Sequence, residues 1–228
     1  MCYSAIILAG GKGNRMNNPI PKQYMLLGGK PVIMHSIERM EVIKEIEEII
    51  IVCSEQYVEY INFMLQQYNI NKKIDFAFAG DTRQASVKSG LLKVKNENVI
   101  IHEAARPFVS VEDFLELINF ENPNTIIGSS INYTVLKGKE TIDGLLDRSE
   151  LINVQLPQKF NTKALLDAHI KAEKENRLFT EDAGLLYFYN SDLKVGIIKG
   201  SESNIKLTTP TDMMIGEIIY DKMLKEGL

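Results

Sequence analysis

The sequence predicts an α/β protein built on a mostly parallel sheet with helices on its faces. Short apolar runs alternate along the chain with segments whose apolar residues recur at helical spacing, which is the order expected of βαβ units. The first apolar run, residues 5–9, has no polar interruption, as is typical of a strand buried on both faces of a parallel sheet. At 228 residues, with no repeat or linker, the chain is expected to form a single domain over 1–228.

The other elements of the first half follow in chain order. Val32, Ile33, Ile37 and Met40 recur at helical spacing and predict a helix over 31–40. Residues 48–53 read Glu-Ile-Ile-Ile-Val-Cys and predict a second buried strand. Apolar residues fall on one side of a helix over 56–68, and a short strand over 74–79 and a helix over 84–95 follow.

The second half continues the alternation. An apolar strand is expected over 98–102, then a helix over 111–120 that carries two acids near its positive N-terminal end. A strand over 125–130 follows. Beyond residue 160 we expect a helix over 162–176, strands over 185–189 and 194–199, and a closing helix over 210–225.

Residues 131–151 interrupt this alternation of strands and helices and predict a β-hairpin with Gly138 at its tip. A two-stranded hairpin is not stable alone in water, so it must pack against something. We expect a dimerisation arm that packs on a second subunit of a homodimer. A solvent-exposed insertion remains the alternative.

Composition narrows the class of protein. The hydrophobic fraction of 45% and the charged fraction of 25% suit a globular protein. The net charge of −4 argues against a nucleic-acid partner, and no apolar run approaches a membrane span. Cys2 and Cys53 have no metal-ligand spacing, and so low a cysteine content suggests a reducing compartment. Because Met1 runs straight into a core strand, we expect no signal peptide and a cytoplasmic location.

A glycine-rich segment follows the first strand and predicts a nucleoside triphosphate site. Closely spaced glycines let backbone N–H groups approach a phosphate. Cations in and after the segment add positive charge: Lys12, Arg15 and Lys22. It is not a Walker loop, because no Ser or Thr follows a Gly-Lys pair, and Met16 occupies the place of the third glycine of a dinucleotide fingerprint. A plain glycine-rich turn between strand and helix is the alternative.

This opening resembles a known family. Leu-Ala-Gly-Gly-x-Gly-x-Arg-Met, followed by Pro-Lys-Gln-Tyr at 21–24, is similar to the signature of the sugar-phosphate nucleotidyltransferases, and in particular of the cytidylyltransferases that act on methylerythritol phosphate and ribitol phosphate. The resemblance implies a Rossmann-like nucleotidyltransferase fold. It also implies that Arg15 and Lys22 stabilise the reacting phosphates. The loop that wraps the CTP would comprise Ala9, Gly10, Gly11 and Gly13.

A second motif, Gly-Asp-Thr-Arg-Gln-Ala-Ser at 80–86, opens the helix expected over 84–95. By itself it is equally an ordinary helix start with Asp81 as the cap. In the family that it resembles, such a stretch reads the cytosine. The residues that this carries over are Gly80, Asp81, Arg83 and Ser86.

A third motif, His-Glu-Ala-Ala-Arg-Pro at 102–107, resembles the family's His-Asp-Ala-Ala-Arg-Pro, whose acid meets a substrate hydroxyl and lies near the metal. This chain has Glu103, a carboxylate one methylene longer, and the resemblance also places Arg106 on the acceptor side. We interpret His102 as a packed residue beneath the site and not as a catalytic base. The motif lies at the carboxyl end of a strand, where open α/β sheets hold their ligands.

Later motifs concern the acceptor phosphate. The resemblance implies that Arg148 and Thr180 hold it, that Thr134 reaches the neighbouring subunit's site, and that Lys206 supports the reacting phosphates. Two positions depart from the family pattern. Leu156 replaces a phosphate-binding threonine, and Glu181-Asp182 reverses the family's order of acids.

The reaction implied is CTP plus a small polyol phosphate giving a CDP-polyol and pyrophosphate, with Mg²⁺ held mainly by the triphosphate and Glu103 as a possible ligand. The most similar activity overall is methylerythritol phosphate cytidylyltransferase, in isoprenoid precursor synthesis. Because the departures cluster on the acceptor side, methylerythritol phosphate is expected to be a poorer acceptor than another polyol phosphate. Alternatives are a ribitol or other alditol phosphate cytidylyltransferase for cell-surface polymers such as teichoic acid, a non-catalytic nucleotide-binding regulator, and an assembly protein.

Overall fold

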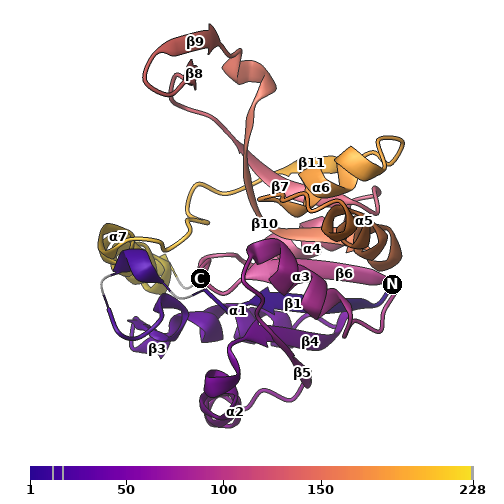
Figure 1. Ribbon diagram of the computed structural model, residues 1–228. Coiled ribbons are helices and arrows are strands. Elements are labelled where there is room, and N and C mark those ends of the chain that lie inside the picture. Colours follow the sequence, from indigo (N-terminus) through magenta and orange to yellow (C-terminus); the bar gives the residue numbers. More distant parts are fainter. Residues whose placement is uncertain (12, 17, 227–228) are drawn as a thin grey trace.

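The computed structural model describes residues 1–11, 13–16 and 18–226 and shows an α/β fold around a seven-stranded sheet of order β11-β7-β10-β6-β1-β4-β5 (Figure 1). The predicted fold class is confirmed. The strands of this sheet are β1 (Tyr3–Leu8), β4 (Ile46–Cys53), β5 (Lys73–Phe78), β6 (Asn98–Glu103), β7 (Thr125–Ser130), β10 (Ile152–Asn161) and β11 (Gly196–Lys199).

Parallel pairing joins β1 to both β4 and β6, and β4 to β5. These strands are the apolar runs that the sequence predicts, and the side chains of Ile6, Ile50 and Ile101 at the middle of three of them are fully buried. Apolar residues on both faces suit strands covered by helices on both sides. The parallel arrangement brings the carboxyl ends of β1, β4 and β6 to one edge of the sheet.

Strand β10 is absent from the sequence-based prediction. It runs antiparallel between β6 and β7, with a register irregularity between Gln155 and Gln158. Its polar residues obscure a central strand in the sequence, although Gln155, Gln158 and Lys159 are buried and donate hydrogen bonds. Gln158 Nε2 donates to the Gln155 carbonyl at 3.2 Å, and the Lys159 ammonium donates to the Ile118 carbonyl at 3.1 Å, near the end of α4. Such bonds offset the cost of burying polar groups.

Helices cover both faces of the sheet. One buried cluster unites the sheet with α1 (Val32–Glu41), α2 (Val58–Gln67) and α4 (Val111–Asn119), and a second unites it with α3 (Arg83–Leu91), α5 (Thr162–Lys174) and α6 (Asp182–Tyr189). The closing helix α7 (Pro210–Glu226) packs beside the small hairpin of β2 (Leu26–Leu27) and β3 (Lys30–Pro31). Single 3₁₀ turns span Asn14–Met16, Lys22–Tyr24, Glu55–Tyr57 and Arg148–Glu150.

Two local predictions are wrong. Residues 185–189, expected as a strand, belong to α6, because Glu181 accepts the Gly184 N–H at 2.7 Å and caps a helix there. Helix α3 ends at Leu91 and not at residue 95, and its N-cap is Thr82 in place of Asp81. The Thr82 hydroxyl accepts the Ala85 N–H at 3.0 Å.

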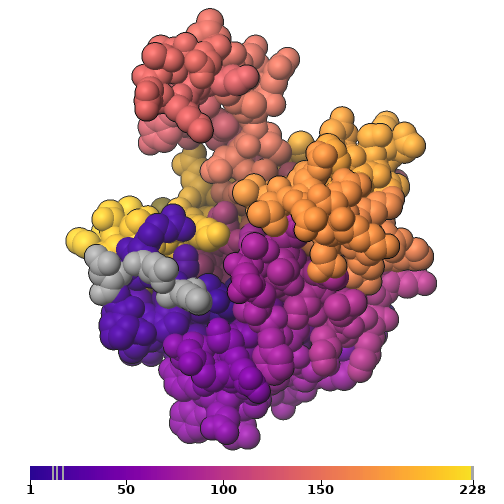
Figure 2. Space-filling view, viewed as in Figure 1, coloured from indigo at the N-terminus to yellow at the C-terminus, as the bar shows by residue number. Residues whose placement is uncertain are grey.

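The predicted hairpin is present and stands away from the rest of the molecule (Figures 1 and 2). Its strands are β8 (Leu136–Gly138) and β9 (Ile142–Leu145). Gly138 pairs with Ile142 inside the ladder, so the turn lies at 139–141 and the predicted tip is one residue early.

Among the described residues, no helix is both long and apolar enough to cross a membrane.

Candidate active site

A cleft of about 560 Å³ lies at the carboxyl ends of the parallel strands. It is bounded by the glycine-rich segment, the start of α3, the end of β6 and the stretch before α7. Most of the predicted catalytic and nucleotide-side residues line it, together with Glu103 from the acceptor side: Gly10, Gly11, Gly13, Arg15, Lys22, Gly80, Asp81, Arg83, Ser86, Glu103 and Lys206. Four separate sequence motifs therefore converge on one cavity. Lys12, also predicted here, lies outside the described residues.

The backbone after β1 is held open by a side chain that the sequence analysis did not single out. Gln23 Nε2 donates to the Ala9 carbonyl at 2.6 Å and to the Gly11 carbonyl at 3.0 Å, from a buried position beneath the segment. At Gly10 a Cβ would come within 2.2 Å of the Ala79 Cβ, so only glycine allows the two loops to approach so closely. Its place in the Pro-Lys-Gln-Tyr motif was the signal in the sequence that could have identified Gln23.

Lys22 extends from the turn after this segment toward the cleft. Burial and, to a smaller extent, the nearby positive charges of Lys206 and Arg15 lower the pKa of its ammonium to about 8, against the opposing effect of Glu103. A cluster of cations that repel one another is a site prepared for a polyanion, because a bound phosphate relieves the repulsion.

This cluster predicts a pH dependence. Lys22 is protonated below its pKa, so kcat/KM for CTP should be level below pH of about 8 and fall above it, as the free enzyme loses the charge that attracts the nucleotide. The measurement is a pH profile of the wild type and of Lys22→Arg, whose guanidinium keeps its charge and should move the fall to higher pH. A wild-type profile that stays flat to about pH 9.5 would contradict this assignment.

Glu103, at the end of β6, is surrounded by basic side chains. Its carboxylate lies 2.6 Å from Lys206 Nζ, 3.3 Å from Arg83 Nε and 3.9 Å from Arg106 Nε. Burial by itself would raise the pKa of Glu103, but Lys206 and Arg83 hold it below its usual value. The carboxylate is therefore ionised and fixes the position of the cations around it.

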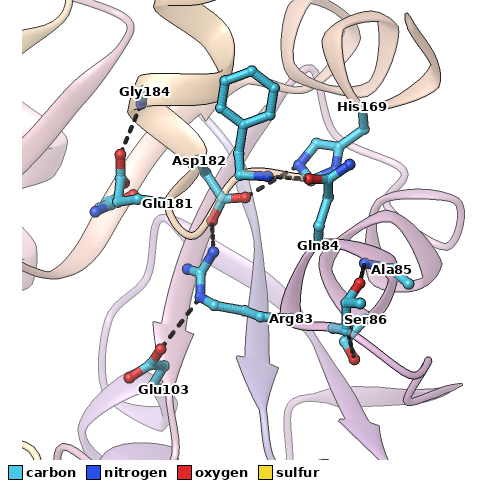
Figure 3. A network of polar contacts seen from close by, with 12 residues as sticks. Arg83, Gln84, Ala85, Ser86, Glu103, His169, Glu181, Asp182 and Gly184 are labelled. Atoms are coloured by element: carbon cyan, nitrogen blue, oxygen red, sulfur yellow. Dashed lines mark hydrogen bonds and ion pairs between the residues drawn. The ribbon is translucent and has the colours of Figure 1, made fainter. Parts of the chain in front are cut away.

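Arg83 joins this group to a buried network that the sequence did not reveal (Figure 3). Its Nη1 lies 2.7 Å from Asp182 Oδ2, and Asp182 Oδ1 lies 3.1 Å from His169 Nε2. Asp182 and His169 are buried and belong to α6 and α5. The only signal for Asp182 was its place in the Thr-Glu-Asp motif, and nothing in the sequence pointed to His169.

Other predicted residues do not line the cleft. Thr134 and Arg148 lie exposed on and beside the hairpin, where Arg148 donates to the Asn132 carbonyl at 3.1 Å. Thr180 is exposed in the loop before α6. Gln84 tethers that loop to α3, since its Oε1 accepts the Phe179 N–H at 2.7 Å and its Nε2 donates to the Arg177 carbonyl at 3.2 Å.

The remaining acceptor-side positions have packing roles. Arg106 donates to the Asn204 carbonyl at 2.8 Å and so supports the stretch that carries Lys206. His102 is fully buried beside Ser36 and Phe114, and burial lowers its pKa to about 3, which agrees with a packed residue. Leu156 lies in the hydrophobic core, where its side chain is 5% exposed.

The cleft offers few protein ligands for a metal ion. No group of three or more His, Cys, Asp or Glu side chains within the described part of the chain could hold one. The cleft does contain carboxylates at Asp81 and Glu103. This donor set fits Mg²⁺ bound mainly through substrate phosphate oxygens, which is how that ion usually binds beside nucleotides.

An α/β fold whose cleft combines a glycine-rich segment with converging cations defines an enzyme class that binds nucleotides and acts on their phosphates. Residues 3–222 match the family model of 2-C-methyl-D-erythritol 4-phosphate cytidylyltransferase. The chain belongs to this family of CTP-dependent cytidylyltransferases, which acts in isoprenoid precursor synthesis.

Individual relatives agree with the family match. Proteins named 2-C-methyl-D-erythritol 4-phosphate cytidylyltransferase from Clostridium botulinum and Geobacillus thermodenitrificans are 37% and 35% identical to this chain. The alignments cover 96% and 99% of this chain, and 98% and 100% of those proteins. A crystal structure of 4-diphosphocytidyl-2C-methyl-D-erythritol synthase from Anaerococcus prevotii is similar with a TM-score of 0.86, 30% identity and 96% coverage of both chains.

Proposed function

We propose that the chain transfers CMP from CTP to 2-C-methyl-D-erythritol 4-phosphate at this cleft. A phosphate oxygen of the acceptor attacks the α-phosphorus of CTP, a new P–O bond forms, the α–β phosphoanhydride bond breaks, and pyrophosphate leaves. The single observation that supports this most strongly is the convergence of Arg15, Lys22 and Lys206 on the cavity that contains the glycine-rich segment. A phosphate monoester is already a nucleophile, so positioning and charge stabilisation supply the catalysis.

The residues divide between the two substrates. Arg15 and Lys22 stabilise charge on the α-phosphate and on the leaving pyrophosphate, and Lys206, held by Glu103, supports the attacked phosphate. The start of α3 receives the cytosine: there the Ser86 hydroxyl accepts the Gly80 N–H at 3.1 Å and donates to the Thr82 carbonyl at 2.9 Å, which fixes the shape of this edge. When bound, Mg²⁺ neutralises part of the triphosphate charge, with Glu103 or Asp81 as its protein ligand.

The acceptor phosphate is proposed to lie between Thr180 of one subunit and Arg148 and Thr134 of a partner. The support for this is the position of residues 131–151, which form an arm on the single domain and carry apolar side chains with nothing to cover them in one subunit. Tyr133 is 84% exposed and Leu145 is 85% exposed. A second copy that packs on the arm would bury them and complete the site.

Both cysteines are free, which suits the reducing cytoplasm where we place the reaction.

Nucleotide choice provides the direct test of this function. Pyrophosphate release with CTP should exceed release with UTP, ATP or GTP by about 100-fold or more in kcat/KM, because a pocket built from fixed hydrogen-bonding groups rejects a base that leaves them unpaired. The assay supplies each nucleotide in turn with methylerythritol phosphate and Mg²⁺. Comparable turnover with UTP would remove the cytosine assignment of the 80–86 segment, and no release with any nucleotide would favour the non-catalytic regulator.

The acceptor is tested in the same assay. The family match supports methylerythritol phosphate as the acceptor, against our sequence-based expectation of a poorer fit. We expect its kcat/KM to exceed those of ribitol phosphate and glycerol phosphate by about tenfold or more, a difference of one or two hydrogen bonds. Glu103→Asp provides the matched variant, since it shortens the carboxylate without removing its charge. A higher kcat/KM for ribitol phosphate would instead support the alditol phosphate alternative.

A further inference from the structure

His169 and Asp182 form a polar pair between α5 and α6. Both side chains are almost fully buried, and the Nδ1 atom of His169 has no hydrogen-bond partner among the described residues. An imidazole with one unpaired nitrogen is costly to bury, and an apolar side chain would pack at lower cost. The two helices already share an extensive apolar contact in the cluster of α3, α5 and α6. Packing of the helices therefore does not explain why a buried histidine and aspartate lie at this contact.

The geometry of the pair points toward the cleft. The Asp182 carboxylate has two oxygens with different partners: Oδ1 receives the His169 N–H at 3.1 Å, and Oδ2 lies 2.7 Å from Arg83 Nη1. Burial by itself would raise the pKa of Asp182, but the Arg83 charge and the His169 hydrogen bond hold it below its usual value. A carboxylate held at one oxygen cannot rotate freely, so its other oxygen presents a fixed anchor to the guanidinium (Figure 3).

Arg83 has a competing partner. Its Nε lies 3.3 Å from Glu103, which also pairs with Lys206 at 2.6 Å. If the anchor at Asp182 loosened, the guanidinium would move toward Glu103 and compete with Lys206 for the same carboxylate. The anchor thus keeps Arg83 at the base side of the cleft and Lys206 available to phosphate.

We propose that His169 is a positioning residue for CTP, which acts through Asp182 to hold the Arg83 guanidinium in the orientation that receives the cytosine. This rests on the proposed function, in which Arg83 contacts the base. His169 itself touches no substrate. Because it acts on the nucleotide side, its loss should affect CTP binding and base selection more than the rate of transfer or the affinity for the acceptor.

The test compares His169→Leu, which removes the donor, with His169→Gln, whose amide N–H can replace it. His35→Leu is the control, because His35 is a second buried histidine whose Nε2 lies 3.0 Å from the Leu27 carbonyl and which does not line the cleft. CTP affinity is measured by titration calorimetry without acceptor, and KM and kcat are measured by pyrophosphate release. His169→Leu should weaken CTP binding by about tenfold, the effect of one hydrogen bond to a charged group, with kcat changed by less than about threefold. His169→Gln should recover most of the affinity, and His35→Leu should retain it.

The discrimination between CTP and UTP should also fall in His169→Leu. If that variant is too unstable to purify, Asp182→Asn breaks the same anchor and should show the same loss. Unchanged CTP affinity in His169→Leu or Asp182→Asn overturns the inference, and so does an equal loss for CTP and acceptor without recovery in His169→Gln. A wild type that binds no CTP would refute the proposed function, and the inference would fall with it.

Discussion

Lys22→Ala is expected to lower kcat by about 100-fold or more while the protein stays folded, the loss seen when one donor to a developing charge is removed. Lys22 lies in the cleft beside Lys206 and Glu103, and its ammonium is partly withdrawn from water, where charge interacts more strongly. Arg15→Ala should act in the same direction and with similar size, because Arg15 lines the same cavity. Pyrophosphate release gives the rates, and thermal unfolding shows that the variants are folded.

Lys163→Ala provides the matched control for these losses. Lys163 is an exposed lysine on α5 that pairs with Asp167 at 2.6 Å and lies outside the cleft. Its removal should leave kcat within about twofold of the wild type, since exposed ion pairs contribute little. Near-normal turnover in a folded Lys22→Ala variant would show that Lys22 takes no part in the transfer.

The second large effect concerns the arm. Removal of residues 135–145 should give an inactive monomer, because a chain without the hairpin has no arm to pack on a second subunit, and each site would then lack Arg148 and Thr134 from a partner. Size-exclusion chromatography with light scattering measures the assembly, and the pyrophosphate assay measures activity. A deletion variant that remains both dimeric and active would refute the proposed role of the arm.

Mixing two inactive variants tests the shared site more sharply. In a mixed dimer of Lys22→Ala and Arg148→Ala, one of the two sites combines an intact Lys22 with an intact Arg148 from the partner. Random exchange makes half of the dimers mixed, so about a quarter of the sites should regain activity. Activity that stays at the level of the separate variants would place Arg148 in its own subunit's chemistry.

The sequence was sufficient for the parallel half of the fold. Strands with uninterrupted apolar runs, such as β4, can be recognised in the sequence. Helices cover both faces of the sheet there, so the residues on both faces are apolar. It failed at β10, where the buried Gln155 amide nitrogen and Lys159 ammonium donate hydrogen bonds in tertiary contacts that no local pattern shows. It also failed at α6, where the run from Leu185 to Tyr189 is apolar and aromatic enough to suit a strand. The cap at Glu181 decides for a helix.

The residues of the candidate site were likewise predictable from the sequence only in part. Residues in compact motifs, such as Arg15 and Glu103, could be predicted because the motif places them directly after a strand. The network of His169 and Asp182 could not, since it joins α5 and α6 to α3 across nearly a hundred positions of sequence. A contact of that kind depends on how the helices pack, and spacing along the chain carries no information on it.

The most direct test of the account is a ³¹P NMR spectrum of the purified protein with CTP, methylerythritol phosphate and Mg²⁺. We predict that the phosphate monoester signal of the acceptor disappears as the signals of a pyrophosphate diester and of free pyrophosphate appear in equal amounts. The same spectrum with Lys22→Ala should show almost no change over that time. Hydrolysis of CTP with the monoester left intact, or no reaction in the wild type, would contradict the proposed transfer.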